Sequence, residues 1–217
     1  MDNRPQIVLP GDQIVHEQTA STLKLGPGLL LLSPPDKLMA TRVGLHGQAH
    51  SRSSSQQQQW IQGHSKRYVA ALGDPVIGII VGKHADGYRV DIGTAQSASL
   101  DGLAFEGATK RNKPNLKIGA VVYARVSLAL SYAETEIECI NPSNQKSDGF
   151  GEMVGGTLIR DLDLTLCKKL LSPPHTLLNK IGAKRKFELS IGMNGRVWCK
   201  ADSISHTIDI VNQIQGC

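Results

Sequence analysis

The sequence predicts a mainly β protein with an α/β C-terminal part, and three observations lead to this fold class. Residues 73–140 contain five short alternating segments separated by glycine-rich turns, which is typical of a small closed barrel. Residues 1–65 contain short apolar segments broken by Pro and Gly, and residues 150–217 alternate helical and strand periods. We therefore predict a small N-terminal β-domain over residues 1–65, a barrel over 66–143 and an α/β domain over 150–217, which suits a chain of 217 residues.

The charge balance favours a polyanionic partner. The net charge is +5 at pH 7, and residues 66–125 hold nine Lys and Arg against five Asp and Glu. Residues 150–217 hold nine against six, so the positive charge lies on the predicted barrel and the C-terminal part. This pattern is compatible with nucleic acid but is shared by many proteins that bind none.

Cysteine use and hydropathy argue against a secreted or membrane protein. The four cysteines are widely spread, none forms a CxxC pair, and no signal peptide is recognisable. We expect a reducing compartment, no disulfide framework, and small buried roles for Cys139, Cys167 and Cys199. No apolar run approaches the roughly 20 residues that span a bilayer, so we expect no membrane partner.

The first 65 residues predict a β-structure with little core of its own, which would lean on another part of the protein. After the turn at Pro10-Gly11-Asp12, the expected strands are Gln13–His16, Leu29–Leu32 and Met39–Gly44. The segment Leu23–Gly28 is expected to turn through Gly26-Pro27-Gly28 into Leu29–Leu32. The stretch from His46 to Gln59 is low in complexity and has no apolar period, which predicts an exposed loop. His46 and His50 have a spacing that binds metal on a helix. Because Gly47 and the polar neighbours disfavour a helix, we interpret them as solvated loop histidines.

The central segment predicts five strands of a barrel of the OB type. They cover residues 76–83, 88–92, 97–103, 122–130 and 135–140. Asp86-Gly87 is a turn dipeptide between the first two strands, because Gly accepts positive φ and Asp bonds locally. In the fourth strand Val122, Ala124, Val126, Leu128 and Leu130 share one face.

Small barrels of this type often bind single-stranded nucleic acid with a basic groove and a few aromatic side chains. A basic loop at residues 110–113, beside a strand face with Tyr and Arg, would meet that need. The alternative interpretation is a solvated charged surface on which the tyrosines only anchor their rings. The candidate RNA-binding residues are Lys83, His84, Tyr88, Arg89, Lys110, Arg111, Lys113, Tyr123 and Arg125.

Residues 141–152 are polar and rich in Gly and Pro, which predicts a domain linker. The elements expected after it are a helix capped by Asp161 and ending near Leu171, a second helix over Thr176–Ile181 with Gly182 as C-cap, strands Phe187–Ile191 and Arg196–Lys200, and a last helix capped by Ser203. A tight turn, Gly192–Gly195, joins the two strands. The last helix should bury one face with Ile204, Ile208, Val211 and Gln215.

This α/β pattern is compatible with a KH domain, which clamps nucleic-acid backbone with a GxxG loop between two helices. That loop should fall near Ile181–Arg185, where the second glycine is missing. We interpret the module as a KH-like domain that lacks the GxxG clamp, although Lys184, Arg185 and Lys186 could still attract phosphate.

The chain resembles the S1/KH cap subunits of the eukaryotic RNA exosome, the exosome component three family, in three stretches: GDPVIGIIVGKHADGYRVDIG, SLDGLAFEGATKRNKPN and IGMNGRVWCKA. The resemblance runs from about residue 66 to the C-terminus. The family's GxNG motif stands here as Gly192, Asn194 and Gly195, and the resemblance implies a structural role in packing against the S1 barrel. The Ser- and Gln-rich stretch at 46–59 departs from the pattern.

The resemblance implies an N-terminal β-domain, an S1 barrel of the OB fold and a KH-like domain. It implies a non-catalytic subunit that sits on a ring of RNase PH-like subunits beside other S1/KH caps. The subunit would stabilise that ring and guide RNA into its channel for 3′-to-5′ processing and decay, including rRNA maturation and mRNA turnover. It further implies a protein of the nucleus and nucleolus, present also in the cytoplasm, with no cofactor, metal or small-molecule substrate.

The residues themselves contain no recognisable catalytic constellation, since the seven histidines are scattered and no nucleophile motif is present. The runner-up hypothesis is a stand-alone S1/KH RNA-binding regulator, which would need its S1 face to bind RNA tightly alone. A nuclease with its own hydrolytic centre is the third hypothesis.

Overall fold

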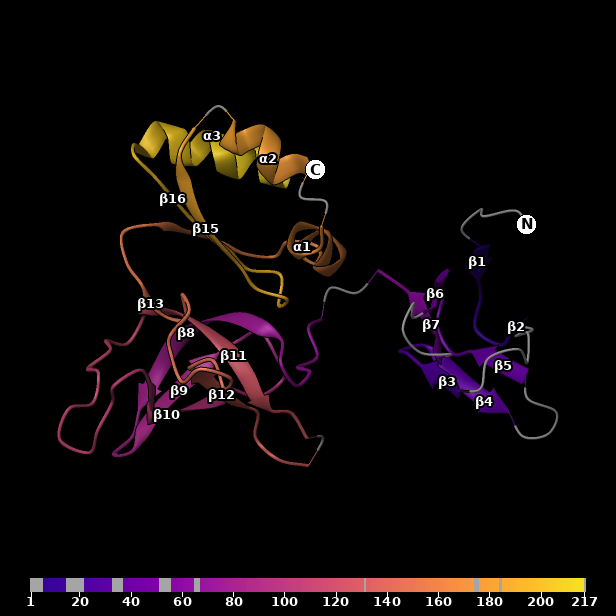
Figure 1. The fold of residues 1–217 in the computed structure, drawn as a ribbon, viewed down its shortest axis with the longest axis horizontal. Coiled ribbons are helices and arrows are strands. Elements are labelled where there is room, and N and C mark those ends of the chain that lie inside the picture. The colour runs from indigo at the N-terminus through magenta and orange to yellow at the C-terminus, as the bar shows by residue number, and fades with distance from the viewer. Residues whose placement is uncertain are drawn as a thin grey trace. The chain divides into compact units, whose positions relative to one another are not determined.

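The computed structural model describes residues 6–14, 22–32, 37–50, 56–64, 67–130, 132–173, 176–183 and 185–216. The chain divides into two compact units, Met1–His64 and Ser65–Cys217. Figure 1 draws the first in indigo to purple and the second in magenta to yellow. The predicted limits of the three domains stay a prediction, and each unit is described by itself.

The N-terminal unit consists of two small sheets. The first has the strand order β1-β6-β7-β3 and the second the order β2-β5-β4. The strands are β1 (Gln6–Val8), β2 (Gln13–Ile14), β3 (Thr22–Leu25), β4 (Leu29–Leu32), β5 (Lys37–Ala40), β6 (Gly44–His50) and β7 (Gln56–Gln62). The unit has a core of its own, contrary to expectation, made by Val8, Ile14, Leu38, Ala40 and Ile61.

The expected exposed loop at residues 46–59 is wrong, because most of it forms the antiparallel hairpin of β6 and β7. Gln57 and Gln59 point inward and are only 6% and 1% exposed. The His46 imidazole Nε2 lies 3.1 Å from Gln59 Oε1, so His46 is not a solvated loop residue. The side chain of His50 lies outside the described residues. Strand β7 alternates between buried and exposed residues, but glutamines occupy its buried face. The sequence therefore shows no apolar period from which the strand could be predicted.

The second unit begins with the barrel, and here the five predicted strands are confirmed. They are β8 (Pro75–Lys83), β9 (Gly87–Asp91), β10 (Ala98–Phe105), β11 (Val121–Leu128) and β12 (Glu136–Cys139). The order β12-β10-β9-β8-β11 closes through pairing of β11 with β12, as Figure 1 shows. Alternate residues of β11 fill the core, among them Val122, Ala124 and Val126. Leu130 lies beyond the strand and is 41% exposed, so its predicted inward place is wrong.

The predicted linker is only partly a linker. Its last residues begin β13 (Gly151–Met153), which pairs with β11 of the barrel. The C-terminal part then runs as β14 (Thr157–Ile159), α1 (Leu164–Leu171), α2 (Thr176–Gly182), β15 (Phe187–Ile191), β16 (Val197–Ala201) and α3 (Ile204–Gln215). Its sheet has the order β14-β16-β15, and α3 packs on β16. A second core of this part includes Cys167, Val197, Cys199 and Ile210.

Two helical predictions need correction. The N-cap of α1 is Asp163, whose carboxylate Oδ1 accepts a 2.9 Å hydrogen bond from Thr165 N, whereas Asp161 has left-handed backbone with φ of 60°. The Ser203 cap of α3 is confirmed, but the buried face consists of Thr207, Ile210 and Ile214. Of the predicted face, Ile204 is 82% and Ile208 53% exposed and Gln215 is exposed, while Val211 is half-buried against the core. Both faces of α3 carry isoleucines, so spacing alone could not choose between them.

The place expected for a GxxG clamp is also wrong. Ile181 and Gly182 belong to α2, and the next element along the chain is β15, so this place does not lie between two helices. In the sequence, the residues between α1 and α2 are 172–175, SPPH, which include no glycine. A clamp that needs close backbone approach to nucleotides is therefore not encoded at either place.

Candidate nucleic-acid interface

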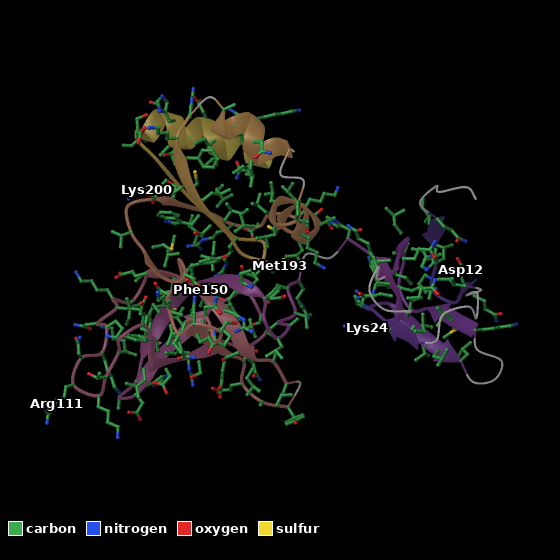
Figure 2. The ribbon with its side chains drawn as sticks, viewed as in Figure 1. Asp12, Lys24, Arg111, Phe150, Met193 and Lys200 are labelled. Atoms are coloured by element: carbon green, nitrogen blue, oxygen red, sulfur yellow. The ribbon has the colours of Figure 1, made fainter. Side chains whose placement is uncertain are left out.

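The loop between β10 and β11 presents two adjacent cations at its tip. Thr109 and Asn112 close a tight turn, because Thr109 N donates to Asn112 O at 3.1 Å and Asn112 N donates back to Thr109 O at 3.0 Å. Lys110 and Arg111 are the two residues between them, and both are exposed. Figure 2 shows Arg111 projecting from the protein surface. This tip can contact phosphate groups without touching bases.

Two lysines of this region make contacts that hold the loop. Lys83 Nζ donates to Asn115 Oδ1 at 2.8 Å, and Lys113 Nζ lies 3.7 Å from Asp86 Oδ1. Asp86 is 97% exposed, so solvent screens the second pair strongly. Lys83 and Lys113 thus join the loop to the β8–β9 turn.

Tyr88, one of the candidate RNA-binding residues, is buried inside the protein. Its side chain belongs to the barrel core and the residue is 7% exposed. The phenol hydroxyl donates to the backbone oxygen of Pro114 and accepts a 3.2 Å hydrogen bond from Leu116 N. Because ring and hydroxyl are both occupied inside the protein, Tyr88 offers no stacking face to RNA.

His84 and Arg89 complete this end of the barrel. Both are exposed, and His84 N donates to Gly87 O at 2.8 Å in the turn. Arg89 on β9 lies opposite Ser99 of β10 and Gly82 of β8. The fold thus brings Lys83, His84 and Arg89 to the strands and turn against which the basic loop, with its Lys113, is held.

The remaining two candidates lie elsewhere and are already engaged. The Tyr123 ring packs on Phe150 with centroids 4.9 Å apart, and its hydroxyl donates to Ile191 O at 3.4 Å. Burial raises the pKa of Tyr123. Arg125 Nη1 lies 3.2 Å from Glu138 Oε1. Both side chains are thus engaged within the protein, and their place in an RNA-binding groove stays a prediction.

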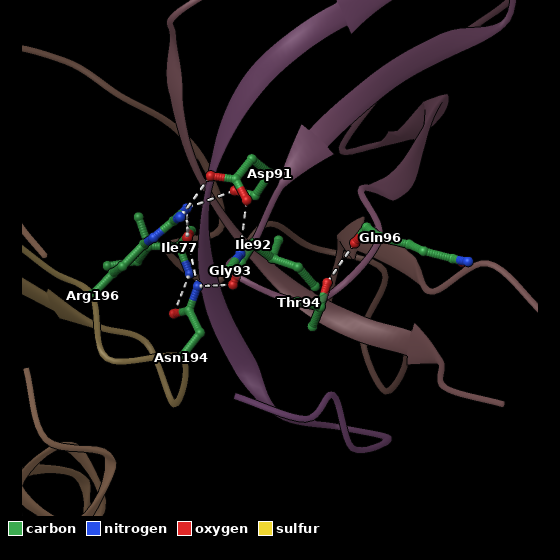
Figure 3. A network of polar contacts seen from close by, with 8 residues as sticks. All are labelled: Ile77, Asp91, Ile92, Gly93, Thr94, Gln96, Asn194 and Arg196. Atoms are coloured by element: carbon green, nitrogen blue, oxygen red, sulfur yellow. Dashed lines mark hydrogen bonds and ion pairs between the residues drawn. The ribbon is translucent and has the colours of Figure 1, made fainter. Parts of the chain in front are cut away.

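The GMNG turn between β15 and β16 joins the C-terminal part to the barrel. Asn194 is 7% exposed, and its carboxamide Nδ2 donates to Ile77 O at 2.8 Å and to Ile92 O at 2.9 Å. Met193 N donates to Pro75 O at 2.8 Å, and the Met193 side chain packs against the barrel core. Figure 3 shows the carboxamide directed at strand β8. The motif is thus part of a rigid junction inside the second unit.

Arg196 strengthens the same junction, and the sequence analysis did not single it out. Its Nη2 lies 2.7 Å from Asp91 Oδ2, and its Nη1 donates to Asp91 O at 2.6 Å (Figure 3). Burial alone raises the pKa of Asp91, but hydrogen bonds from Arg196 and from Gly93 N, with the charges of Arg196 and Arg160, outweigh it and lower the pKa. The signal available in the sequence was the position of Arg196, directly after the motif.

Two other features are missing from the part of the chain that the structure describes. Its residues hold no group of three or more His, Cys, Asp or Glu placed to share a metal ion. Within the same ranges, no helix is long and apolar enough to cross a membrane.

The second unit consists of a barrel of the OB type and a β-α-α-β-β-α domain, which are hydrogen-bonded to each other through the buried Asn194. This combination defines the class of S1/KH proteins. Comparison with known proteins agrees. Family models match in three places: the S1 domain of exosome complex component RRP40 over residues 68–151, a KH domain over 156–205, and the exosome complex exonuclease Rrp40 N-terminal domain over 23–67.

The relatives match over nearly the whole chain. Exosome complex component rrp40 of Schizosaccharomyces pombe is 41% identical, covering 96% of this chain and 86% of its own length. Exosome complex component RRP40 of Homo sapiens is 37% identical and covers 98% of this chain and 84% of its own length. That of Saccharomyces cerevisiae is 36% identical and covers 97% of this chain and 88% of its own length. The chain belongs to the RRP40 family of exosome complex components.

One solved structure supports the fold alone. A crystal structure assigned provisionally to the exosome complex RNA-binding proteins superimposes with a TM-score of 0.54 at 18% identity. It covers 69% of this chain and 96% of its own.

Proposed function

We propose that this chain is a non-catalytic, RNA-binding cap subunit of an RNA exosome. It stabilises a ring of RNase PH-like subunits, beside other S1/KH caps, and helps guide RNA into the central channel for 3′-to-5′ processing and decay. The observation that carries the proposal is the match to exosome complex components along 96% of the chain, at 41% identity. The function includes rRNA maturation and mRNA turnover, in the nucleus, the nucleolus and the cytoplasm.

The arrangement of the second unit supports a guiding role. The S1 and KH-like parts are joined by buried hydrogen bonds through Asn194, which suits a rigid scaffold. Lys110 and Arg111 are the accessible cations at the tip of the loop. Neither Tyr88, which is buried, nor Tyr123, which packs on Phe150, presents an open ring beside them for base stacking. Contacts of this kind attract the phosphate backbone of any RNA, which is what a channel entrance for many RNAs needs.

The assembly is tested by native mass spectrometry of the tagged chain purified from its own cells, with an RNA-degradation assay on the same sample. We expect a large multi-subunit particle that degrades RNA, while the isolated chain does not. A lone monomer that binds RNA tightly would instead establish the stand-alone regulator. Degradation by the isolated chain would establish a nuclease.

The RNA contact is tested separately with the double substitution Lys110→Ala and Arg111→Ala. Removing two phosphate contacts should make the slope of log affinity against log salt less negative by about 1.4 for single-stranded RNA. Lys113 is kept, because it pairs with Asp86. The control carries Lys24→Ala and Lys37→Ala, which remove the same charge from exposed positions of the N-terminal unit. An unchanged slope in the loop variant would reject the contact.

The subcellular distribution is tested by fluorescence imaging of the tagged chain expressed from its own promoter. We expect signal throughout the nucleus, enriched in the nucleolus, with a weaker cytoplasmic pool. Exclusion from the nucleus would contradict the localisation while leaving the assembly experiment to decide the function.

A further inference from the structure

The loop that carries Lys110 and Arg111 is held on both sides. On its first limb, Ala108 N donates to Phe105 O at 3.1 Å, and Glu106 Oε2 accepts a 2.8 Å hydrogen bond from Ser147 N. The tip is closed by the mutual hydrogen bonds of Thr109 and Asn112. The second limb, Pro114 to Leu116, has a different kind of support, since side chains of β8 and β9 hold it.

The support of the second limb centres on a single hydroxyl. A phenol offers one donor and can also accept, and Tyr88 uses both on backbone atoms of this limb. It donates to Pro114 O and accepts from Leu116 N. Leu116 is 3% exposed, so its N–H would lose a needed partner without the hydroxyl. The Tyr88 ring is fixed in the barrel core, so the anchor is rigid.

The other attachments of this limb are weaker because they are exposed to solvent. The hydrogen bond from Lys83 to Asn115 is exposed, and the pair of Lys113 with Asp86 is 3.7 Å long with Asp86 in open solvent. Exposed pairs of this kind contribute little to order. Among the described residues, Tyr88 therefore supplies the buried side-chain attachment of the loop.

We infer that Tyr88 is a positioning residue for RNA binding, which acts by holding the basic loop in one conformation. The inference rests on the proposed function and goes beyond it, because Tyr88 itself touches no RNA. A loop that is already ordered loses less conformational entropy when Lys110 and Arg111 engage phosphates. Tyr88 thus sets how tightly two cations bind without changing their number.

The test is Tyr88→Phe in the full chain, which removes one oxygen and keeps the ring. Amide hydrogen exchange should accelerate at Leu116 and across residues 106–112. Affinity for a labelled oligouridylate of about 12 nucleotides should fall about threefold to tenfold. The salt slope should stay at the wild-type value, because the same phosphates are contacted. A general loss of stability would not accelerate amide exchange in this loop alone while leaving the salt slope of RNA binding unchanged.

The matched control is Tyr68→Phe. Tyr68 is also a core tyrosine, 6% exposed, and its hydroxyl donates to Asp74 Oδ2 at 3.0 Å, away from the basic loop. We expect it to lower stability without changing exchange in residues 106–112 or RNA affinity. A second loop variant, Pro114→Gly, loosens the limb without touching the core and should weaken RNA binding as Tyr88→Phe does.

The outcomes separate the inference from the proposed function. If Lys110→Ala with Arg111→Ala weakens binding but Tyr88→Phe and Pro114→Gly do not, the positioning role is overturned and the RNA contact stands. An altered salt slope in Tyr88→Phe, or the same affinity loss in Tyr68→Phe, overturns it as well. If the double loop variant binds RNA as the wild type does, the proposed RNA contact fails, and the positioning role fails with it.

Discussion

The side-chain amide of Asn194 pairs with the backbone of Ile77 as a neighbouring strand would. Its Oδ1 accepts from Ile77 N at 3.2 Å, and its Nδ2 donates to Ile77 O at 2.8 Å. The same Nδ2 also donates to Ile92 O at 2.9 Å. A carboxamide has the donor and acceptor that a peptide group has, so one side chain from the GMNG turn satisfies three backbone groups of the barrel.

Asn194→Ala should destabilise the second unit strongly. The substitution removes the Asn194 partner of Ile77 N and Ile92 O and leaves Ile77 O with a 3.4 Å hydrogen bond from Arg196 Nη1. The expected loss is about 2–4 kcal/mol in the free energy of unfolding. Urea denaturation followed by tryptophan fluorescence measures it. The control is Asn144→Ala, because Asn144 lies in an exposed loop and hydrogen-bonds only to exposed partners. Equal losses in the two variants would contradict the role given to Asn194.

Gly195→Ala should be harmful for two separable reasons. Gly195 has a φ of 73°, and a Cβ there would lie 2.7 Å from Leu162 O. Gly119 has a φ of 88° with nothing within 4 Å of its would-be Cβ. Gly119→Ala should therefore cost about 1–2 kcal/mol from backbone strain alone, and Gly195→Ala about 3 kcal/mol or more. The difference in melting temperature between the two variants isolates the contact with Leu162.

The ion pair of Asp91 with Arg196 should make stability depend on acid pH. The pKa of Asp91 is lowered in the folded protein despite its partial burial, because Arg196 and Gly93 N hold the charged form. A lowered carboxyl pKa stabilises the fold above the ordinary value of about 3.9, and this contribution disappears as pH falls through the folded pKa. Unfolding free energy measured between about pH 5 and pH 2 should fall less steeply in Asp91→Asn than in the wild type. Parallel curves would rule out the linkage.

The buried thiols should be unreactive until the protein unfolds. Cys139, Cys167 and Cys199 are free and buried. Burial, the largest cause in each, raises the pKa of Cys139 to about 12, that of Cys167 to about 11, and also that of Cys199. Since the thiolate is the reactive form, a thiol-specific chromogenic reagent at neutral pH should modify these three only after guanidinium is added. Mass mapping identifies the sites, and rapid labelling of Cys167 in the native state would contradict the assignment.

The barrel could be predicted because its residues obey a local rule. Strands such as β11 alternate apolar and polar residues, and turns such as Asp86-Gly87 lie between them. The GMNG turn could be located for the same reason, as a glycine-rich stop between two strands. The resemblance to a known family implied that this turn packs against the barrel, but nothing local in the sequence relates Asn194 to Ile77, which lies 117 positions away.

The parts that failed share a physical cause, namely that burial is not determined by residue type alone. Tyr88 and Tyr123 are amphipathic, and only the tertiary fold decides whether the ring faces solvent or the core. Gln57 and Gln59 are polar but buried. In α3 the stripe with Ile210 competes with that of Ile208, and the packing on β16 decides.

The junction through Asn194 and Met193 also determines how the molecule comes apart. Because backbone groups of β8 and β9 depend on residues of the β15–β16 turn, neither the barrel nor the KH-like part can open alone without exposing unsatisfied groups of the other. The two parts therefore form one cooperative folding unit, although they are recognised as separate modules in sequence. Thermal melting of this region should show a single transition. A substitution that disrupts the GMNG turn should therefore also destabilise the barrel strands.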